Sequence, residues 1–172
     1  MAVQAHPLID EVTKKAPVAW LTVGEAPAYL VWCLGLEGAL YVVSGPGEQP
    51  APGLAEASEA LVTARGDHGG RVATWPVRVV RVEPGSDEWN GVAPKLAGKR
   101  LNAPVPADDL VARWAAECVV CRLEPAGPPV EAGDTLPEES LAAPPVPSPA
   151  TRRPRNPFRL HRVRPPRTSR RS

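Results

Sequence analysis

Apolar and polar residues alternate over several short segments of the chain, and this pattern predicts a protein built mainly of strands. Residues 6–15 predict a short helix, because Pro7 suits the first helical position and the apolar residues after it have helical spacing. Helical spacing returns from Ser86, ends near residues 95–103, and starts again from Asp108 or Asp109. Runs of apolar residues, most of them bounded by Gly, Pro or polar turns, predict six strands, over residues 18–23, 29–34, 40–44, 59–65, 71–83 and 118–123.

Two of these predicted strands have patterns typical of a small, strongly coiled barrel. The segment from Arg71 to Glu83 keeps its apolar residues on one parity as far as Val79 and on the other parity afterwards, which predicts a β-bulge. The segment from Tyr29 to Leu34 is apolar on both parities. We expect the barrel core to cover one of its faces, and a helix or a partner subunit to cover the other. Antiparallel strands with short, segregated helices predict an α+β domain around a barrel.

Charge divides the chain into three parts, although its 20 basic and 19 acidic residues nearly cancel over 172 positions. Residues 1–124 have the length and composition of one domain. Residues 125–150 are rich in Pro and Ala, carry acids and no basic residue, and predict a linker. Residues 151–172 hold nine Arg and no acid. This tail cannot bury enough apolar surface to offset its ordering entropy, so we expect it to be disordered.

The composition excludes several classes of protein. No apolar run approaches the length of a membrane span. The first ten residues lack a basic stretch followed by an apolar one, so we expect no secretory signal and a cytoplasmic protein. Three cysteines do not make a disulfide framework. The Arg-rich tail could attract nucleic acid or an anionic membrane, but a solvated polar tail is the preferred interpretation.

Two motifs that resemble reactive sites have simpler structural interpretations. Cys118 and Cys121 have CXXC spacing, but a spacing of three on a strand places them on opposite faces, where they cannot share a metal or form a disulfide. His68 follows Asp67 in a Gly-rich segment, for which a hairpin turn is preferred over a general base. The sequence therefore predicts no metal site and assigns no catalytic residue.

Two further segments are candidates for binding an anion. Ser44 ends a predicted strand, and the glycines that follow, beginning with Gly45, could present backbone N–H groups to an oxyanion such as phosphate. A plain connecting loop is the alternative. Lys95, Lys99 and Arg100 lie together at the end of a predicted helix, where they could either clamp an anion or interact with the helix dipole.

The order of elements and three short phrases carry a resemblance to a known family. The phrases are Tyr41-Val-Val-Ser44, Gly69-Gly-Arg-Val72 and Lys99-Arg-Leu-Asn102. Over roughly residues 5–124 the chain resembles the pyridoxamine 5'-phosphate oxidase-like, FMN-binding split-barrel proteins, particularly their small bacterial members. The resemblance implies a six-stranded antiparallel split barrel, a homodimer, and FMN or a deazaflavin at the dimer interface.

In that family a hydroxyl at the end of the third strand, and basic residues a few positions later, hold the flavin phosphate. Ser44 matches the hydroxyl, but Glu48-Gln49-Pro50 stands where basic residues are expected, and no Lys or Arg lies between Lys15 and Arg65. Basic residues elsewhere would then have to supply the charge. The candidate cofactor-binding residues are Ser44, Gly45, Gln49, Arg65, Arg71, Lys95, Lys99 and Arg100.

The sequence therefore leaves two alternative functions open. The first is a flavin- or deazaflavin-dependent oxidoreductase of unknown substrate, in which the flavin supplies the hydride chemistry and the protein contributes no catalytic side chain. The second is a cofactor-free, dimeric split-barrel binding module, whose basic tail contacts anionic partners. The departure at Glu48 and Gln49 motivates the second function.

Overall fold

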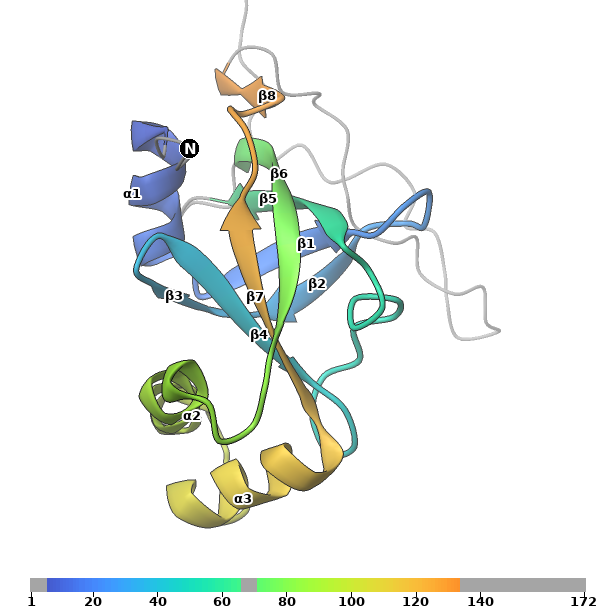
Figure 1. The fold of residues 1–172 in the computed structure, drawn as a ribbon. Helices are drawn as coiled ribbons and strands as arrows, with labels where there is room; N and C mark the ends of the chain where they lie inside the picture. The colour runs from blue at the N-terminus through green and yellow to red at the C-terminus, as the bar shows by residue number, and fades with distance from the viewer. Residues whose placement is uncertain (1–5, 66–70, 134–172) are drawn as a thin grey trace, which may run out of the picture. The chain divides into compact units, whose positions relative to one another are not determined.

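The computed structural model describes residues 6–65 and 71–133 (Figure 1). The predicted turn around Asp67 and His68, and the Arg-rich segment 151–172, lie outside the described residues. The helices are α1 (Pro7–Lys15), α2 (Asp87–Lys99) and α3 (Ala107–Glu117). The strands are β1 (Val18–Thr22), β2 (Tyr29–Trp32), β3 (Leu34–Leu36), β4 (Ala39–Ser44), β5 (Glu59–Arg65), β6 (Arg71–Val82), β7 (Val119–Pro125) and β8 (Glu131–Ala132).

The strands form one antiparallel sheet that curls into a nearly closed barrel. Their order is β2-β1-β5-β6-β7-β4-β3, and β8 pairs with β6. The two ends of this path, β2 and β3, are consecutive parts of one chain segment that is interrupted at Cys33. The backbone N–H of Cys33 donates to the carbonyl of Pro17 rather than to a neighbour in the sheet path. The predicted α+β split barrel is confirmed, and its path has seven strands rather than six because the bend divides the 29–34 segment.

The predicted bulge near Val79 is wrong, because β6 pairs with β7 in regular register across Val79 and Leu123. The register shift of β6 lies against β5, between Ala64 and Arg65. β6 instead changes partner along its length, pairing first with β5 and then with β7. Its apolar parity changes because Trp75 faces the barrel core, whereas Val82 packs on the other core.

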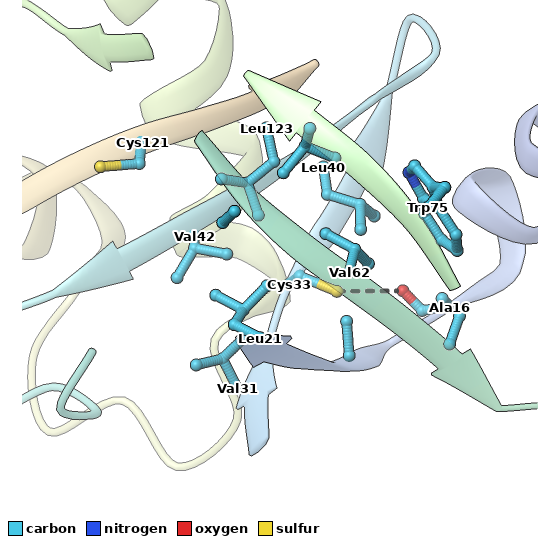
Figure 2. Packing of buried hydrophobic residues seen from close by; sticks show 14 of the residues in the cluster. Ala16, Leu21, Val31, Cys33, Leu40, Val42, Val62, Trp75, Cys121 and Leu123 are labelled. Carbon is cyan, nitrogen blue, oxygen red and sulfur yellow. Dashed lines mark hydrogen bonds between the residues drawn. The ribbon is translucent and has the colours of Figure 1, made fainter. Parts of the chain in front are cut away.

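Two hydrophobic cores lie on opposite faces of β4 and β7. The barrel core contains side chains from most of the strands, which converge as Figure 2 shows. The second core packs α2 and α3 onto the outer faces of the same strands, and the two helices lie beside each other (Figure 1). Trp75 is fully enclosed in the first core and Trp114 in the second. The side chains on both faces of β4 are buried as far as Val43, so this strand lies between the two cores.

The N-terminal helix α1 lies unusually close to β3. A Cβ atom built on Gly35 would lie 1.8 Å from the backbone carbonyl oxygen of Thr13, so only glycine permits this approach. Ile9 and Thr13 are the buried residues of the helix. No helix within the described ranges has the length and apolar character that crossing a membrane requires.

Candidate functional site

The loop after β4 contains a carboxylate that is completely enclosed by its partners. The side chain of Glu48 is 0% exposed. Its Oε2 accepts a hydrogen bond from Arg100 Nε at 2.8 Å, and its Oε1 accepts one from an Arg113 guanidinium nitrogen at 2.5 Å. Trp114 Nε1 donates to the same Oε1 at 3.0 Å. Two guanidinium groups and one indole are therefore committed to one carboxylate.

Helices α2 and α3 bring these partners to the loop. Arg100 is the C-cap of α2, and Arg113 lies on α3 next to the enclosed Trp114. Arg113 also donates to the carbonyl of Pro46 at 2.5 Å, and Gly47, with φ +74°, leaves room for its guanidinium. The loop is thus wrapped around Arg113 and fixed to both helices.

The same contacts set the ionisation of Glu48. Burial by itself raises the pKa of its carboxyl group, but hydrogen bonds from Trp114, Arg100 and Arg113 outweigh burial and lower the pKa below its ordinary value. The group is therefore a carboxylate at neutral pH. Its charge offsets much of the positive charge of the two arginines, which are each about a quarter exposed.

Gln49, one of the predicted cofactor-binding residues, connects two strands. Its Oε1 accepts from the backbone N–H of Trp32 at 2.7 Å, and its Nε2 donates to the carbonyls of Trp32 at 2.9 Å and Val43 at 3.1 Å. The amide thus links the backbone of β2 to that of β4. Its donors and acceptor are used within the protein, which leaves little capacity for a ligand.

Ser44 and Gly45 line a shallow hollow of about 400 Å³. The hollow also takes in the carboxylate residues Glu48 and Glu117, and none of its lining residues is basic. Gly45 has φ +142°, and a Cβ atom there would lie 2.9 Å from the Cα of Cys118, so close packing explains the glycine. A phosphate dianion requires charge-assisted donors. The residues at this loop therefore do not fit the flavin phosphate that the family holds there.

The remaining predicted residues are dispersed. Arg65 of β5 and Arg71 of β6 stand opposite each other in the backbone register of the sheet, but their side chains are not among those described. Lys95 and Lys99 are exposed on α2, and of the predicted basic cluster Arg100 alone reaches the Ser44 loop, as a partner of Glu48. The sequence did not indicate Arg113 or Trp114 as members of this site.

A second, deeper hollow of about 470 Å³ lies elsewhere. It is formed by the C-terminal end of α1, the bend between β2 and β3, and the end of α2. Lys14, Lys15, Lys99 and Arg100 line it together with mostly apolar residues. Lys99 and Arg100 were among the cofactor-binding residues predicted from the sequence, whereas the lysines of α1 were not.

The cysteines are consistent with a structural role. Cys118 lies in the helix-packed core and Cys121 in the barrel core, so the two face opposite ways, as predicted. Burial raises the pKa of the Cys121 thiol to about 11 and that of Cys33 to about 12, which keeps both protonated and unreactive. Across residues 6–65 and 71–133, no group of three or more His, Cys, Asp or Glu side chains is arranged to hold a metal ion.

Comparison with known proteins identifies the fold of this chain. No protein-family model and no curated protein matches the chain. The solved structure of HutZ, the heme storage protein of Vibrio cholerae, matches with a TM-score of 0.53 and 14% identity over 76% of this chain and 96% of that chain. A provisionally assigned pyridoxamine 5'-phosphate oxidase from Listeria innocua gives 0.49 and 13% over 70% and 93%, and an FAD-binding protein from Mesorhizobium loti gives 0.46 and 15% over 74% and 95%. The match to HutZ, at 14% identity, supports the fold alone, and this chain therefore has a split-barrel fold.

Proposed function

We propose that the protein is a homodimeric split-barrel binding module that does not hold a flavin phosphate at the Ser44 loop. The observation that carries this proposal is the enclosed Glu48 carboxylate, which takes up Arg100 and Arg113. A bound phosphate would have to compete with that carboxylate for the nearest guanidinium groups, beside a second acid, Glu117. The loop follows a strand that ends in a hydroxyl, but the two arginines beside it are already bonded to Glu48.

A flavin- or deazaflavin-dependent oxidoreductase of unknown substrate is the second candidate. Ser44 favours it, because this partly exposed residue ends β4 at the position where the family places its phosphate-binding hydroxyl. A bound flavin would supply the hydride chemistry. The contribution of this chain would then be to hold and orient it, with Ser44 as the nearest hydroxyl donor.

Titration of the full-length protein with FMN separates the two candidates. We expect no saturable change in FMN absorbance or fluorescence at micromolar protein, because the loop offers no uncommitted cation. Riboflavin, which lacks the phosphate, serves as the comparison ligand, and Ser44→Ala as the comparison variant. A stoichiometric FMN complex that is weaker with riboflavin and weakened by Ser44→Ala would establish the oxidoreductase candidate instead.

The dimer proposal rests on the outer face of β1, β2 and β5. Val18, Leu30 and Leu61 are 39%, 50% and 37% exposed there. Trp20 is paired with Leu30 across the sheet, so these apolar side chains are contiguous. Val18 and its partner Trp32 lie at one end of this face, where they also line the hollow beside α1. Leu30 and Leu61 are exposed on this face, whereas Trp32 packs against the helix-lined core. A helix therefore covers one end of the apolar 29–34 segment, and we assign the covering of the part around Leu30 to a partner subunit. A second copy fits because a twofold interface buries the same patch on both subunits.

Leu30→Glu is expected to weaken dimerisation about 100-fold, because it places a charge at the centre of the proposed interface. Sedimentation equilibrium on the full chain measures the dissociation constant. Val105→Glu is the matched control, since Val105 is 39% exposed and lies before α3, away from this face. A monomeric wild-type protein, or equal dissociation constants for both variants, would refute the proposed interface.

A further inference from the structure

The hollow between α1, the β2–β3 bend and α2 has a basic lining. Among the described residues that line it, four are basic and none is acidic. Arg100 is bonded to Glu48, and Lys14 and Lys15 form exposed pairs with Asp10 at 2.6 Å and Glu11 at 2.8 Å. Such exposed pairs within a helix contribute little free energy, so the Lys14 ammonium can turn towards a ligand.

Lys99 is the most available of these cations. It lies in the last turn of α2 and is exposed, and within the described part of the chain it has no ion-pair partner. It lines the hollow across from the lysines at the end of α1. Positive groups from two separate helices therefore converge on one opening, a geometry that the dipole of a single helix does not explain.

The walls below this basic rim are apolar. Val18, the partly exposed Trp32 and Leu34 line the hollow beneath the lysines. Cys33 and Ala16 also line the hollow, and the thiol of Cys33 donates to the carbonyl of Ala16 at 3.5 Å, the contact drawn in Figure 2. A volume of about 470 Å³ falls in the range of sites that enclose small organic ligands.

We propose that this hollow binds a small aromatic organic anion, whose ring packs against Trp32 and whose acid group lies between Lys99 and Lys14. The inference deepens the proposed binding function by naming its ligand class. The aromatic body follows from the apolar walls and the indole, and the acid group follows from a basic rim that contains no carboxylate. The site is separate from the Ser44 hollow, which is lined by acids.

The test uses 1-naphthoate as the probe and 1-naphthalenemethanol as its neutral counterpart, each titrated into the full-length protein by calorimetry. We expect saturable binding of 1-naphthoate, weakened about tenfold by Lys99→Ala and by added salt, as for one lost ion-pair contact. Lys95→Ala is the matched control, because it removes the same charge from an exposed position of α2 that does not line the hollow. It should leave the affinity unchanged.

Equal affinity for the alcohol and the acid, or equal effects of Lys99→Ala and Lys95→Ala, would overturn the proposal, as would an absence of saturation at millimolar probe. Competition between FMN and 1-naphthoate distinguishes a failure of this proposal from a failure of the proposed function. FMN that displaces 1-naphthoate, and loses affinity with Lys99→Ala but not with Ser44→Ala, would support the hollow as an aromatic-anion site. Failure of the probe with an intact dimer and no FMN binding would overturn this inference alone.

Discussion

Replacing Glu48 by alanine is expected to lower the free energy of unfolding by about 3–5 kcal/mol, the usual cost of removing one partner from a buried ion pair. The substitution leaves the guanidinium groups of Arg100 and Arg113 and the indole N–H of Trp114 without their shared acceptor. Both arginines are about three-quarters shielded from solvent, so water replaces the lost carboxylate only in part. The loop after β4 also loses its connection to α2 and α3.

Urea denaturation, followed by tryptophan fluorescence, measures this loss. Glu56→Ala is the control, because Glu56 is exposed in the segment that follows the same loop, and it should change stability by no more than about 0.5 kcal/mol. Glu48→Gln should fall between the two, since the amide keeps an acceptor but loses the charge. Equal midpoints for Glu48→Ala and Glu56→Ala would show that the enclosed carboxylate does not stabilise the fold.

Acid should remove the same contribution from the wild-type protein. The pKa of Glu48 in the folded state lies below its ordinary value of 4.5, so folding favours the ionised form. This contribution is fully present above about pH 4.5, the unfolded value, and is lost as the pH falls through the folded pKa. The stability difference between wild type and Glu48→Gln should therefore be constant from pH 7 to about pH 5 and narrow below it. A difference that stays constant to pH 3 would contradict the lowered pKa.

The barrel could be predicted because its signals are local. Alternating apolar residues and Gly or Pro turns appear within each segment, and they correctly indicated the six barrel segments and the helices. The division of the 29–34 segment at Cys33 could not be predicted, because the bend results from closing the sheet upon itself. The supposed bulge at Val79 failed for a related reason, since a change in which face of the strand is buried inverts the apolar pattern just as a bulge does.

The site was harder to predict because its contacts join distant parts of the chain. The partners of Glu48 lie 52, 65 and 66 residues away, so no spacing rule relates them. In the sequence, Glu48 is an acid where a phosphate-binding cation is expected, and only the fold shows that it has neighbouring arginines. The shortage of positive charge at the loop was visible in the sequence, but its cause was not.

The basic cluster shows the opposite problem, because residues close in sequence have separate roles. Lys95 is exposed on α2, Lys99 lines the deeper hollow, and Arg100 ends the helix and turns to Glu48. Their directions follow from the helical rotation and from the C-cap, which the sequence could only approximate. Lys99 and Arg100 therefore both line the deeper hollow, but Arg100 is also bonded to Glu48, and Lys95 lines neither hollow.

Gly35→Ala is expected to destabilise the protein by about 3 kcal/mol, at the upper end of the usual cost of overpacking. The added Cβ would lie 1.8 Å from the carbonyl oxygen of Thr13 and 2.8 Å from its carbonyl carbon. Both are backbone atoms of α1, so no side-chain rotation relieves the contact, and the helix must move away from β3. Ile9 and Thr13, 0% and 1% exposed, would lose their packing, and the hollow beside Gly35 would change shape.

Gly91→Ala is the matched control for this substitution, because a Cβ atom at that exposed position of α2 meets no atom within 4 Å. Alanine should stabilise the helix there by about 0.5–1 kcal/mol, so the same chemical change has opposite signs at the two glycines. Urea denaturation gives both values, and amide hydrogen exchange shows whether the loss at Gly35 is concentrated in α1. If Gly35→Ala unfolds at the same urea concentration as the wild type, then α1 does not lie against β3 as closely as the packing at Thr13 requires, and α1 does not form a wall of the basic hollow.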